Sequence, residues 1–295
     1  MTSLPRIGFI GLGLMGAAMV GRLQDKGYPL TVLANRSRAA VDAAVARGAT
    51  EAKTARDLAQ ASDIVMLCMG TSEQVEARML GDEGVLAGLS SDAVVIDFGT
   101  SQPASTRMLA ERAAQQGAAF LDAPLGRTPA HAKDGKLNIM GAGDADAFAR
   151  VRPVLEDLGE NVFHLGPSGT GHTIKLINNF FGMTTAMAMS EAFAMADAAG
   201  IPRDTLYGVM SAGPLRSGMM DLVRNYAVEG RNDMDFSLGN ACKDVGYYVA
   251  MGEHLGAQPR IGPATLALLE ETVAADMGEC MVPEAVDYLK ERGTE

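Results

Sequence analysis

The feature that most constrains the fold is a glycine pattern near the start of the chain. The pattern G-x-G-x-x-G is formed by Gly11, Leu12, Gly13, Leu14, Met15 and Gly16. It follows the apolar run IGFI directly and opens a segment of helical period, MGAAMVGRLQDKG. In that context the glycines permit a tight turn and let a pyrophosphate approach free N–H groups at the helix N-terminus. We therefore predict that these residues bind a dinucleotide, the alternative being a glycine turn with only a structural role.

The first half of the chain alternates between two kinds of segment. Short apolar runs, RIGFIGL, PLTVLAN, DIVMLCM, AVVIDFG and AFLDAPL, are separated by Ala-rich segments of helical period. Strands that alternate with helices predict a parallel, doubly wound sheet. We expect an α/β Rossmann domain over residues 1–165.

The second half changes to long segments rich in Met and Ala. The first of them, over residues 172–200, predicts a helix of about 28 residues, or about 42 Å at 1.5 Å per residue. That is too long for one compact layer, so we expect this helix to run between domains or into a partner subunit. We interpret the methionines of MTTAMAMSEAFAM as core. An all-α domain is predicted over residues 166–295, joined to the first domain by the long helix.

Composition excludes several classes of protein. A formal net charge of -11 argues against a nucleic-acid binder. Cys68, Cys242 and Cys280 are too widely spaced for a disulfide framework or a metal pair, and Cys68 is interpreted as a buried small hydrophobe. Neither a secretory leader nor a membrane-spanning run is recognisable, so we expect a cytoplasmic protein without membrane contact.

The end of the second predicted strand bears on the choice of cofactor. Asn35, Arg36 and Ser37 stand there, followed by Arg38, and no carboxylate occurs between residues 25 and 42. A basic turn accommodates the 2′-phosphate of NADP, whereas NAD usually needs an acidic residue for its ribose. We predict NADP, with NAD as the alternative. If the basic residues have no role in cofactor binding, they form a solvated turn.

Two further strand ends border the same crevice. Met69 and Gly70 follow the third predicted apolar run, and Thr100 follows the fourth. Ligands in a doubly wound sheet bind outside the carboxyl ends of the strands. We expect Met69 and Thr100 to contact the nicotinamide end of the cofactor.

Polar residues share one face of the predicted long helix. Lys175, Asn178, Asn179 and Gly182 stand at positions i, i+3, i+4 and i+7. A lysine on an otherwise apolar helix is costly unless it meets water, an anion or hydrogen-bond partners. Its ammonium group could donate to a carbonyl oxygen that gains charge during a reduction. The alternative is a solvated helix face.

The histidines give no metal signature. His131 and His172 are interpreted as solvated side chains, and the remaining histidines are isolated from carboxylates at recognisable spacing. We predict a reaction without a metal ion.

These pieces together resemble the β-hydroxyacid dehydrogenases, also called the 3-hydroxyisobutyrate dehydrogenase family, over nearly the whole chain. The resemblance rests on GFIGLGLMG, VIDFGTSQP, LDAPLG, GTGHTIKLINN and ACKDVGYYVA. It implies a Rossmann domain, a helical domain, a homodimer or homotetramer built through the long helix, and reversible oxidation of a short 3-hydroxy acid with NAD(P). It also implies that Lys175 is the general acid/base, that Asn178 and Asn179 hold substrate or lysine, and that Lys243 and Asp244 close the site beside substrate and cofactor.

One loop departs from the usual family pattern D-A-P-V-S-G-G. Here the last three positions are Gly126, Arg127 and Thr128, a triplet that resembles the 3-sulfolactaldehyde reductases, where the arginine grips a sulfonate. A planar guanidinium holds an oxyanion better than a neutral hydroxyl does. We expect these three residues to bind the anionic end of a substrate. The alternatives are a carboxylate substrate and a plain ion pair between Arg127 and a surface acid.

The sequence thus predicts that a short anionic aldehyde, similar to 3-sulfolactaldehyde, is reduced to its primary alcohol with a proton from Lys175. A reductase for succinic or tartronate semialdehyde is the first alternative, and an imine reductase or a non-catalytic NADP-binding module the others. Two further positions depart from the family pattern: Gly70 stands where proline is common, and Gly182 removes a polar group where a serine is often found.

Overall fold

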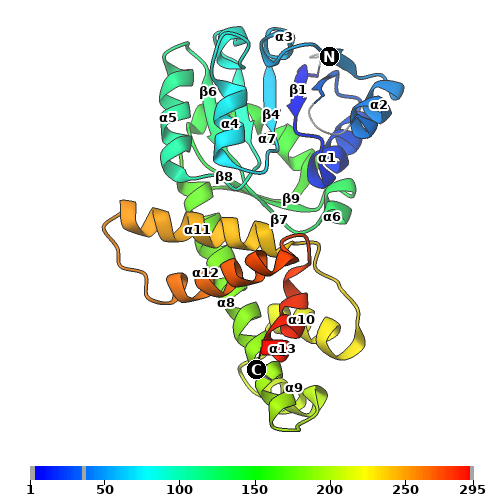
Figure 1. The fold of residues 1–295 in the computed structure, drawn as a ribbon. Coiled ribbons are helices and arrows are strands. Elements are labelled where there is room, and N and C mark those ends of the chain that lie inside the picture. The colour runs from blue at the N-terminus through cyan, green and yellow to red at the C-terminus, as the bar shows by residue number, and fades with distance from the viewer. Residues whose placement is uncertain (1–3, 35–37, 293–295) are drawn as a thin grey trace. The chain divides into compact units, whose positions relative to one another are not determined.

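The computed structural model describes residues 4–34 and 38–292 and divides the chain into two compact units, Met1–Lys175 and Leu176–Glu295. Figure 1 shows the first unit in blue to green and the second in green to red. These are units of spatial packing, so the domain boundary between residues 165 and 166 stays a prediction.

The first unit is built on a six-stranded sheet in the order β3-β2-β1-β4-β5-β6, with every neighbouring pair parallel. Its strands are β1 (Ile7–Ile10), β2 (Leu30–Leu33), β3 (Thr50–Ala52), β4 (Ile64–Leu67), β5 (Val94–Asp97) and β6 (Ala119–Asp122). Phe9 in β1 lies opposite Val32 on one side and Met66 on the other. The predicted parallel, doubly wound sheet is confirmed.

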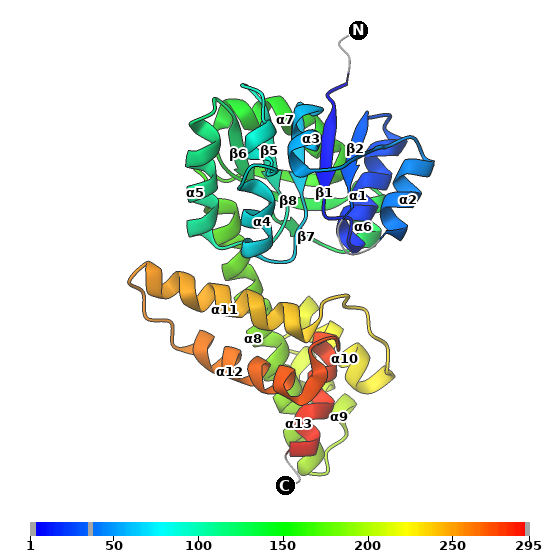
Figure 2. The same ribbon diagram turned by 45° about the horizontal axis from the view of Figure 1, so that its top comes forward.

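Helices cover both faces of this sheet, as Figure 2 shows. Alternate residues of β4 belong to different cores: Met66 packs with α1, α2 and α7, whereas Leu67 packs with α3, α4 and α5. The helical segments around this sheet are α1 (Leu14–Asp25), α2 (Ala39–Ala46), α3 (Ala55–Gln60), α4 (Ser72–Met79), η1 (Leu86–Gly88), α5 (Pro103–Ala114) and α7 (Ala145–Leu158).

A second, three-stranded sheet was not predicted. Its order is β7-β8-β9, with β7 (Leu125–Gly126) antiparallel to β8 (Leu137–Gly141) and β8 parallel to β9 (Gly159–His164). The short helix α6 (Pro129–Lys133) connects β7 to β8. The run AFLDAPL is therefore not one strand: it is split near Pro124, which has no N–H for a sheet ladder, between two sheets.

Over the residues that the structure describes, the named elements of the second unit are all helical, and Ser237 and Met281 form an isolated antiparallel bridge. The helix α8 (Thr170–Ala198) begins in the first unit and continues into the second. The others are α9 (Arg203–Ser211), α10 (Gly218–Glu229), α11 (Leu238–His254), α12 (Ile261–Thr272), η2 (Val273–Met277), η3 (Val282–Glu284) and α13 (Ala285–Arg292). Met183, Met187 and Met189 are buried together with Phe193, which confirms three of the four methionines as core, whereas Met195 is 66% exposed and the prediction is wrong there.

Within the two described ranges, none of the helices combines the length and the apolar character that crossing a membrane requires.

Candidate active site

The glycine turn between β1 and α1 is closed by its first and last glycines. Gly11 has φ +98°, and a Cβ there would lie 2.3 Å from the carbonyl oxygen of Cys68. A Cβ on Gly16 would lie 1.9 Å from the carbonyl oxygen of Gly11. Gly13 is different, because a Cβ on it would have no protein atom within 4 Å. Close packing within the chain thus requires glycine at positions 11 and 16, whereas Gly13 borders open space.

The start of α1 is suited to an anion. Its N-cap residue, Gly13, makes no side-chain capping bond, and the first turn contains no acidic residue. The N–H groups of a helix N-terminus attract negative charge, so a pyrophosphate can approach at Gly13. Met69 lies beside this turn, because its Sδ would be 3.0 Å from a Cβ on Gly11. These residues fit a dinucleotide.

The basic turn after β2 is described in part. Asn35, Arg36 and Ser37 lie outside the described residues. Arg38 binds Glu51 through two hydrogen bonds of 2.6 and 2.8 Å and Asp42 through one of 2.9 Å. These hydrogen bonds with Glu51 and Asp42 raise the pKa of Arg38, so its charge is already compensated.

The loop after β5 is held by the carboxylate of Asp97. Asp97 accepts hydrogen bonds from the Gly99 N–H at 2.8 Å and the Ser101 hydroxyl at 2.7 Å, on either side of Thr100. Burial and the nearby Asp97 raise the pKa of the Cys68 thiol to about 12, which agrees with its interpretation as an inert small hydrophobe.

The loop after β7 holds Arg127 in an unusual backbone conformation, with φ 77°. Arg127 Nη1 donates to the carboxylate of Glu160 at 2.5 Å and to the carbonyl oxygen of Lys136 at 2.7 Å. This is the pair with a surface acid that the sequence left open. Among the described residues, Nε and Nη2 of Arg127 have no hydrogen-bond partner, so one edge of the guanidinium remains available.

Polar residues of α8 and α11 form a chain of contacts in the second unit. Asn179 donates from Nδ2 to Asp244 at 2.6 Å and accepts at Oδ1 from Asn178 at 3.3 Å. Lys243 forms an ion pair of 2.9 Å with Asp244, which is 1% exposed. The structure thus brings together four of the predicted residues. Lys175 lies one turn before Asn179 on α8, at the end of the first unit.

Two family models match the chain. Residues 6–166 match the NAD binding domain of 6-phosphogluconate dehydrogenase, and residues 169–287 match the model described as NAD-binding of NADP-dependent 3-hydroxyisobutyrate dehydrogenase. The chain belongs to the β-hydroxyacid dehydrogenase family. It is an NAD(P)-dependent oxidoreductase of that family.

Relatives within the family differ in the substrate that their names give. The NAD-dependent L-serine dehydrogenase of Pseudomonas aeruginosa is 38% identical over 70% of this chain and 69% of its own length. The 3-sulfolactaldehyde reductase of Escherichia coli is 30% identical over 92% of this chain and 91% of its own. A solved structure of Mycobacterium tuberculosis 3-hydroxyisobutyrate dehydrogenase with L-serine has a TM-score of 0.85 at 24% identity, covering 98% of this chain and 100% of that one, which shows a shared fold.

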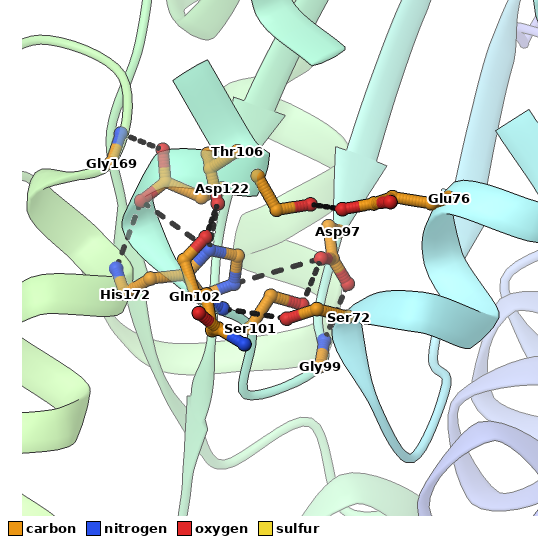
Figure 3. Close-up of polar contacts among 11 residues, drawn as sticks. Ser72, Glu76, Asp97, Gly99, Ser101, Gln102, Thr106, Asp122, Gly169 and His172 are labelled. Atoms are coloured by element: carbon orange, nitrogen blue, oxygen red, sulfur yellow. Dashed lines mark hydrogen bonds and ion pairs between the residues drawn. The ribbon is translucent and has the colours of Figure 1, made fainter. Parts of the chain in front are cut away.

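The dehydrogenase also contains a buried histidine that sequence reasoning misjudged. His172, on the first turn of α8, is fully buried and not solvated. Its Nδ1 lies 2.7 Å from the Thr106 hydroxyl, and its Nε2 lies 3.7 Å from Asp97 (Figure 3). The available signal was that both buried strands β5 and β6 end in aspartate, Asp97 and Asp122, which need donors.

His131 is likewise not simply solvated. It is half-buried, and its Nδ1 lies 2.8 Å from the hydroxyl of Thr128. This contact fixes the side chain of Thr128, which precedes α6. Over the described residues, no group of three or more His, Cys, Asp or Glu side chains is arranged to hold a metal ion.

Proposed function

We propose that this dehydrogenase reduces a short aldehyde bearing an anionic group, with a sulfonate of the 3-sulfolactaldehyde kind as the preferred group. The observation that carries the proposal is Arg127 in the loop after β7, at φ 77°. A residue other than glycine at positive φ costs on the order of 1–3 kcal/mol. The usual family pattern has glycine at this position. Arginine thus occupies a strained position next to the predicted site, which is typical of a functional role.

The remaining edge of Arg127 suits a sulfonate. Glu160 and the Lys136 carbonyl contact Nη1 alone, so Nε and Nη2 can donate to two oxygens of one oxyanion. The hydroxyl of Thr128 and the backbone at Gly126 lie on either side of Arg127 in the chain. We assign these three residues to the anionic end of the substrate.

The opposite end of the substrate is assigned to α8. Lys175 protonates the oxygen of the aldehyde as negative charge develops on it, and the amides of Asn178 and Asn179 orient the substrate. The carboxylate of Asp244 holds the Asn179 amide at 2.6 Å, which fixes the direction of its carbonyl oxygen. We assign Lys243 to the substrate, and Lys243 together with Asp244 to the cofactor.

The cofactor is held at the glycine turn by residues 11–16, at the strand ends by Met69 and Thr100, and at the ribose by residues 35–37. When bound, it supplies the hydride. We propose NADP as the preferred cofactor, with NAD as the alternative. Because Arg38 is already paired with Glu51 and Asp42, Arg36 is the cation we assign to a 2′-phosphate.

A carboxylate-bearing substrate is the second candidate. Two observations favour it: Arg127 already binds the carboxylate of Glu160, and a relative 38% identical is named an L-serine dehydrogenase. Succinic and tartronate semialdehyde belong to this class. The clamp and the proton donor are the same in both candidates.

We also propose that the enzyme assembles as a homodimer or homotetramer through α8. Ile177, Phe181 and Met195 on this helix are 48%, 71% and 66% exposed. Large apolar side chains along one helix indicate contact with another protein surface. Size-exclusion chromatography with light scattering tests this assignment.

Lys175→Ala tests the proton donor. We expect turnover to fall at least about a hundredfold, since losing a charged donor to a developing oxyanion costs about 2.7–4 kcal/mol. Cofactor affinity, measured by NADPH fluorescence titration, should stay within about twofold. Lys290→Ala, an exposed lysine of α13, is the matched control. Unchanged turnover in Lys175→Ala would remove this lysine from its role.

Arg127→Ser tests the substrate class. The parent and the variant are compared with sulfolactaldehyde, succinic semialdehyde, tartronate semialdehyde and L-serine, each with both cofactors. We expect kcat/KM for the sulfonate to fall about 10- to 100-fold, the range for losing a charge-assisted hydrogen bond. Arg152→Ser, which breaks an exposed ion pair with Glu156 on α7, is the control. If sulfonate turnover survives in Arg127→Ser, the sulfonate assignment is wrong.

A further inference from the structure

The start of α8 is bound to the sheet through a buried polar cluster, which consists of Asp97, Thr106, Asp122 and His172 (Figure 3). All four residues are at most 1% exposed. They come from four elements: Asp97 ends β5, Thr106 lies in α5, Asp122 ends β6, and His172 lies in α8. The cluster contains none of the residues assigned above to substrate or cofactor.

Asp122 caps α8 from the end of a strand. Its carboxylate accepts hydrogen bonds from the backbone N–H groups of Gly169 at 2.8 Å and His172 at 2.9 Å. These N–H groups have no partner within the helix, so a carboxylate there stabilises the helix start. Gly171 lets the turn approach, since a Cβ there would lie 2.2 Å from the carbonyl oxygen of Met140.

His172 adds a second attachment through its side chain. The Thr106 hydroxyl lies 2.7 Å from His172 Nδ1 and 3.2 Å from the carbonyl oxygen of Gln102. The imidazole therefore ties α8 to α5 at a point where backbone capping alone does not reach.

The far side of the ring faces the end of β5. His172 Nε2 has no hydrogen-bond partner among the described residues and lies 3.7 Å from Oδ2 of Asp97. The same Asp97 carboxylate holds the loop that contains Thr100. One side chain thus lies between the strand end assigned to the cofactor and the helix that carries Lys175.

We propose that His172 is a positioning residue: it joins the first turn of α8 to α5 and to the ends of β5 and β6, and thereby fixes the place of Lys175 three residues later. The inference rests on the proposed role of Lys175 as proton donor. Proton transfer requires a near-attack geometry, and a displacement of about 1 Å can cost up to about a hundredfold in rate. His172 contacts neither reacting group and acts through the helix backbone.

The test compares two threonine-to-valine variants. Thr106→Val and Thr173→Val each remove a hydroxyl that donates to a backbone carbonyl four residues earlier, Gln102 or Gly169. Only Thr106→Val also removes the partner of His172. Because the backbone loss is matched, a difference between the two variants reports the histidine contact.

The first readout is amide hydrogen exchange over residues 170–176, which needs no turnover. We expect exchange there to rise about fivefold in Thr106→Val, the effect of one lost hydrogen bond of about 1 kcal/mol, whereas Thr173→Val, which loses its own bond to the Gly169 carbonyl in this segment, measures the effect of that local loss. Unchanged exchange in Thr106→Val overturns the inference. This outcome is separate from a failure of the proposed function, which Lys175→Ala detects.

The second readout divides the kinetic effect. In Thr106→Val we expect kcat to fall about tenfold, while KM and the NADPH dissociation constant stay within about twofold, because positioning acts on the chemical step. Equal values of kcat in the two valine variants would reduce the cluster to a structural role and overturn the inference.

Substitution of the histidine itself completes the test. His172→Asn keeps an amide that can donate or accept near the place of Nδ1 and is expected to retain kcat within about threefold, whereas His172→Leu removes the hydrogen-bonding group and should behave like Thr106→Val. If His172→Leu does not fold, His172→Asn and Thr106→Val still test the inference. An Asn variant as slow as Thr106→Val contradicts the assignment of the Nδ1 contact.

Discussion

Among the turns of the first unit that place a residue at positive φ, two are assigned to ligand binding, and they differ in the side chain at that position. In the turn between β1 and α1, Gly11 takes φ +98° without a side chain, as the close carbonyl of Cys68 requires. In the loop after β7, Arg127 takes φ 77° with a long, charged side chain. The first turn offers a ligand its backbone, so side chains must be absent. The second offers a side chain, and the backbone carries the strain.

Alanine substitutions in the first turn give the largest expected effects. In Gly16→Ala, the Cβ would lie 1.9 Å from the carbonyl oxygen of Gly11, so the turn must change shape. We expect a loss of about 1–3 kcal/mol in the free energy of unfolding, as for an overpacked core. NADPH binding should weaken at least about a hundredfold, because the backbone donors lose their arrangement. Thermal denaturation and fluorescence titration measure the two effects.

Gly13→Ala is the matched variant, because the added methyl group has no protein atom within 4 Å. The free energy of unfolding should change by less than about 0.5 kcal/mol. NADPH affinity should still fall about tenfold, since the methyl group stands where a pyrophosphate approaches the helix. A Gly13→Ala protein that binds NADPH as tightly as the parent would show that the ligand does not approach there.

Arg127→Gly tests the second turn, in which the side chain rather than the backbone is expected to bind the ligand. Glycine relieves the positive φ, so we expect the free energy of unfolding to rise by about 1 kcal/mol even though the ion pair with Glu160 is lost. The value of kcat/KM for the anionic aldehyde should fall at least about tenfold. Asp92→Gly, at φ 71° in an exposed turn, should stabilise the protein without changing kinetics. A less stable Arg127→Gly protein would mean that the position is not strained.

Local patterns predicted one part of this molecule well. The strands with apolar runs, the glycine turn and the long helix α8 all follow from residues close together in the chain. Four strands were missed: β3 reads only TEA, β7 has two residues, and β8 and β9 contain the polar residues of LNIMG and GENVFH. Short or polar strands are formed by their neighbours in space, which periodicity does not contain.

Long-range contacts explain the misjudged side chains. His172 is buried because Thr106 and Asp122, 66 and 50 residues away in the chain, receive it. Nothing in GTGHTIK distinguishes that burial from exposure. The contact of Arg127 with Glu160, 33 residues on, is of the same kind. Sequence indicated which residues carry charge near the site, but their partners depend on the tertiary fold.

The smallest expected effect concerns the contact between Arg127 and Glu160. Glu160 is an exposed residue of β9 whose carboxylate takes up part of the charge of Arg127. In Glu160→Gln, the guanidinium keeps its place near the Lys136 carbonyl but loses its fixed anion. KM for an anionic aldehyde should therefore fall about two- to threefold, with kcat unchanged. Glu156→Gln, which removes a similarly exposed partner from Arg152, is the control.

The pH dependence of the difference in KM between the parent and Glu160→Gln follows from the carboxyl group of Glu160. The hydrogen bond and charge of Arg127 hold the pKa of Glu160 below its usual 4.5, so the ion pair is complete above that value and is lost as the pH falls through the lowered pKa. Between about pH 6 and 8 the carboxyl stays ionised, and the ratio of KM between parent and Glu160→Gln should be constant. In acid the parent should approach the variant, because protonation removes the same charge. A ratio that changes across neutral pH would show that Glu160 does not oppose the substrate anion at Arg127, and the second turn would then bind its ligand by other means than its side chain.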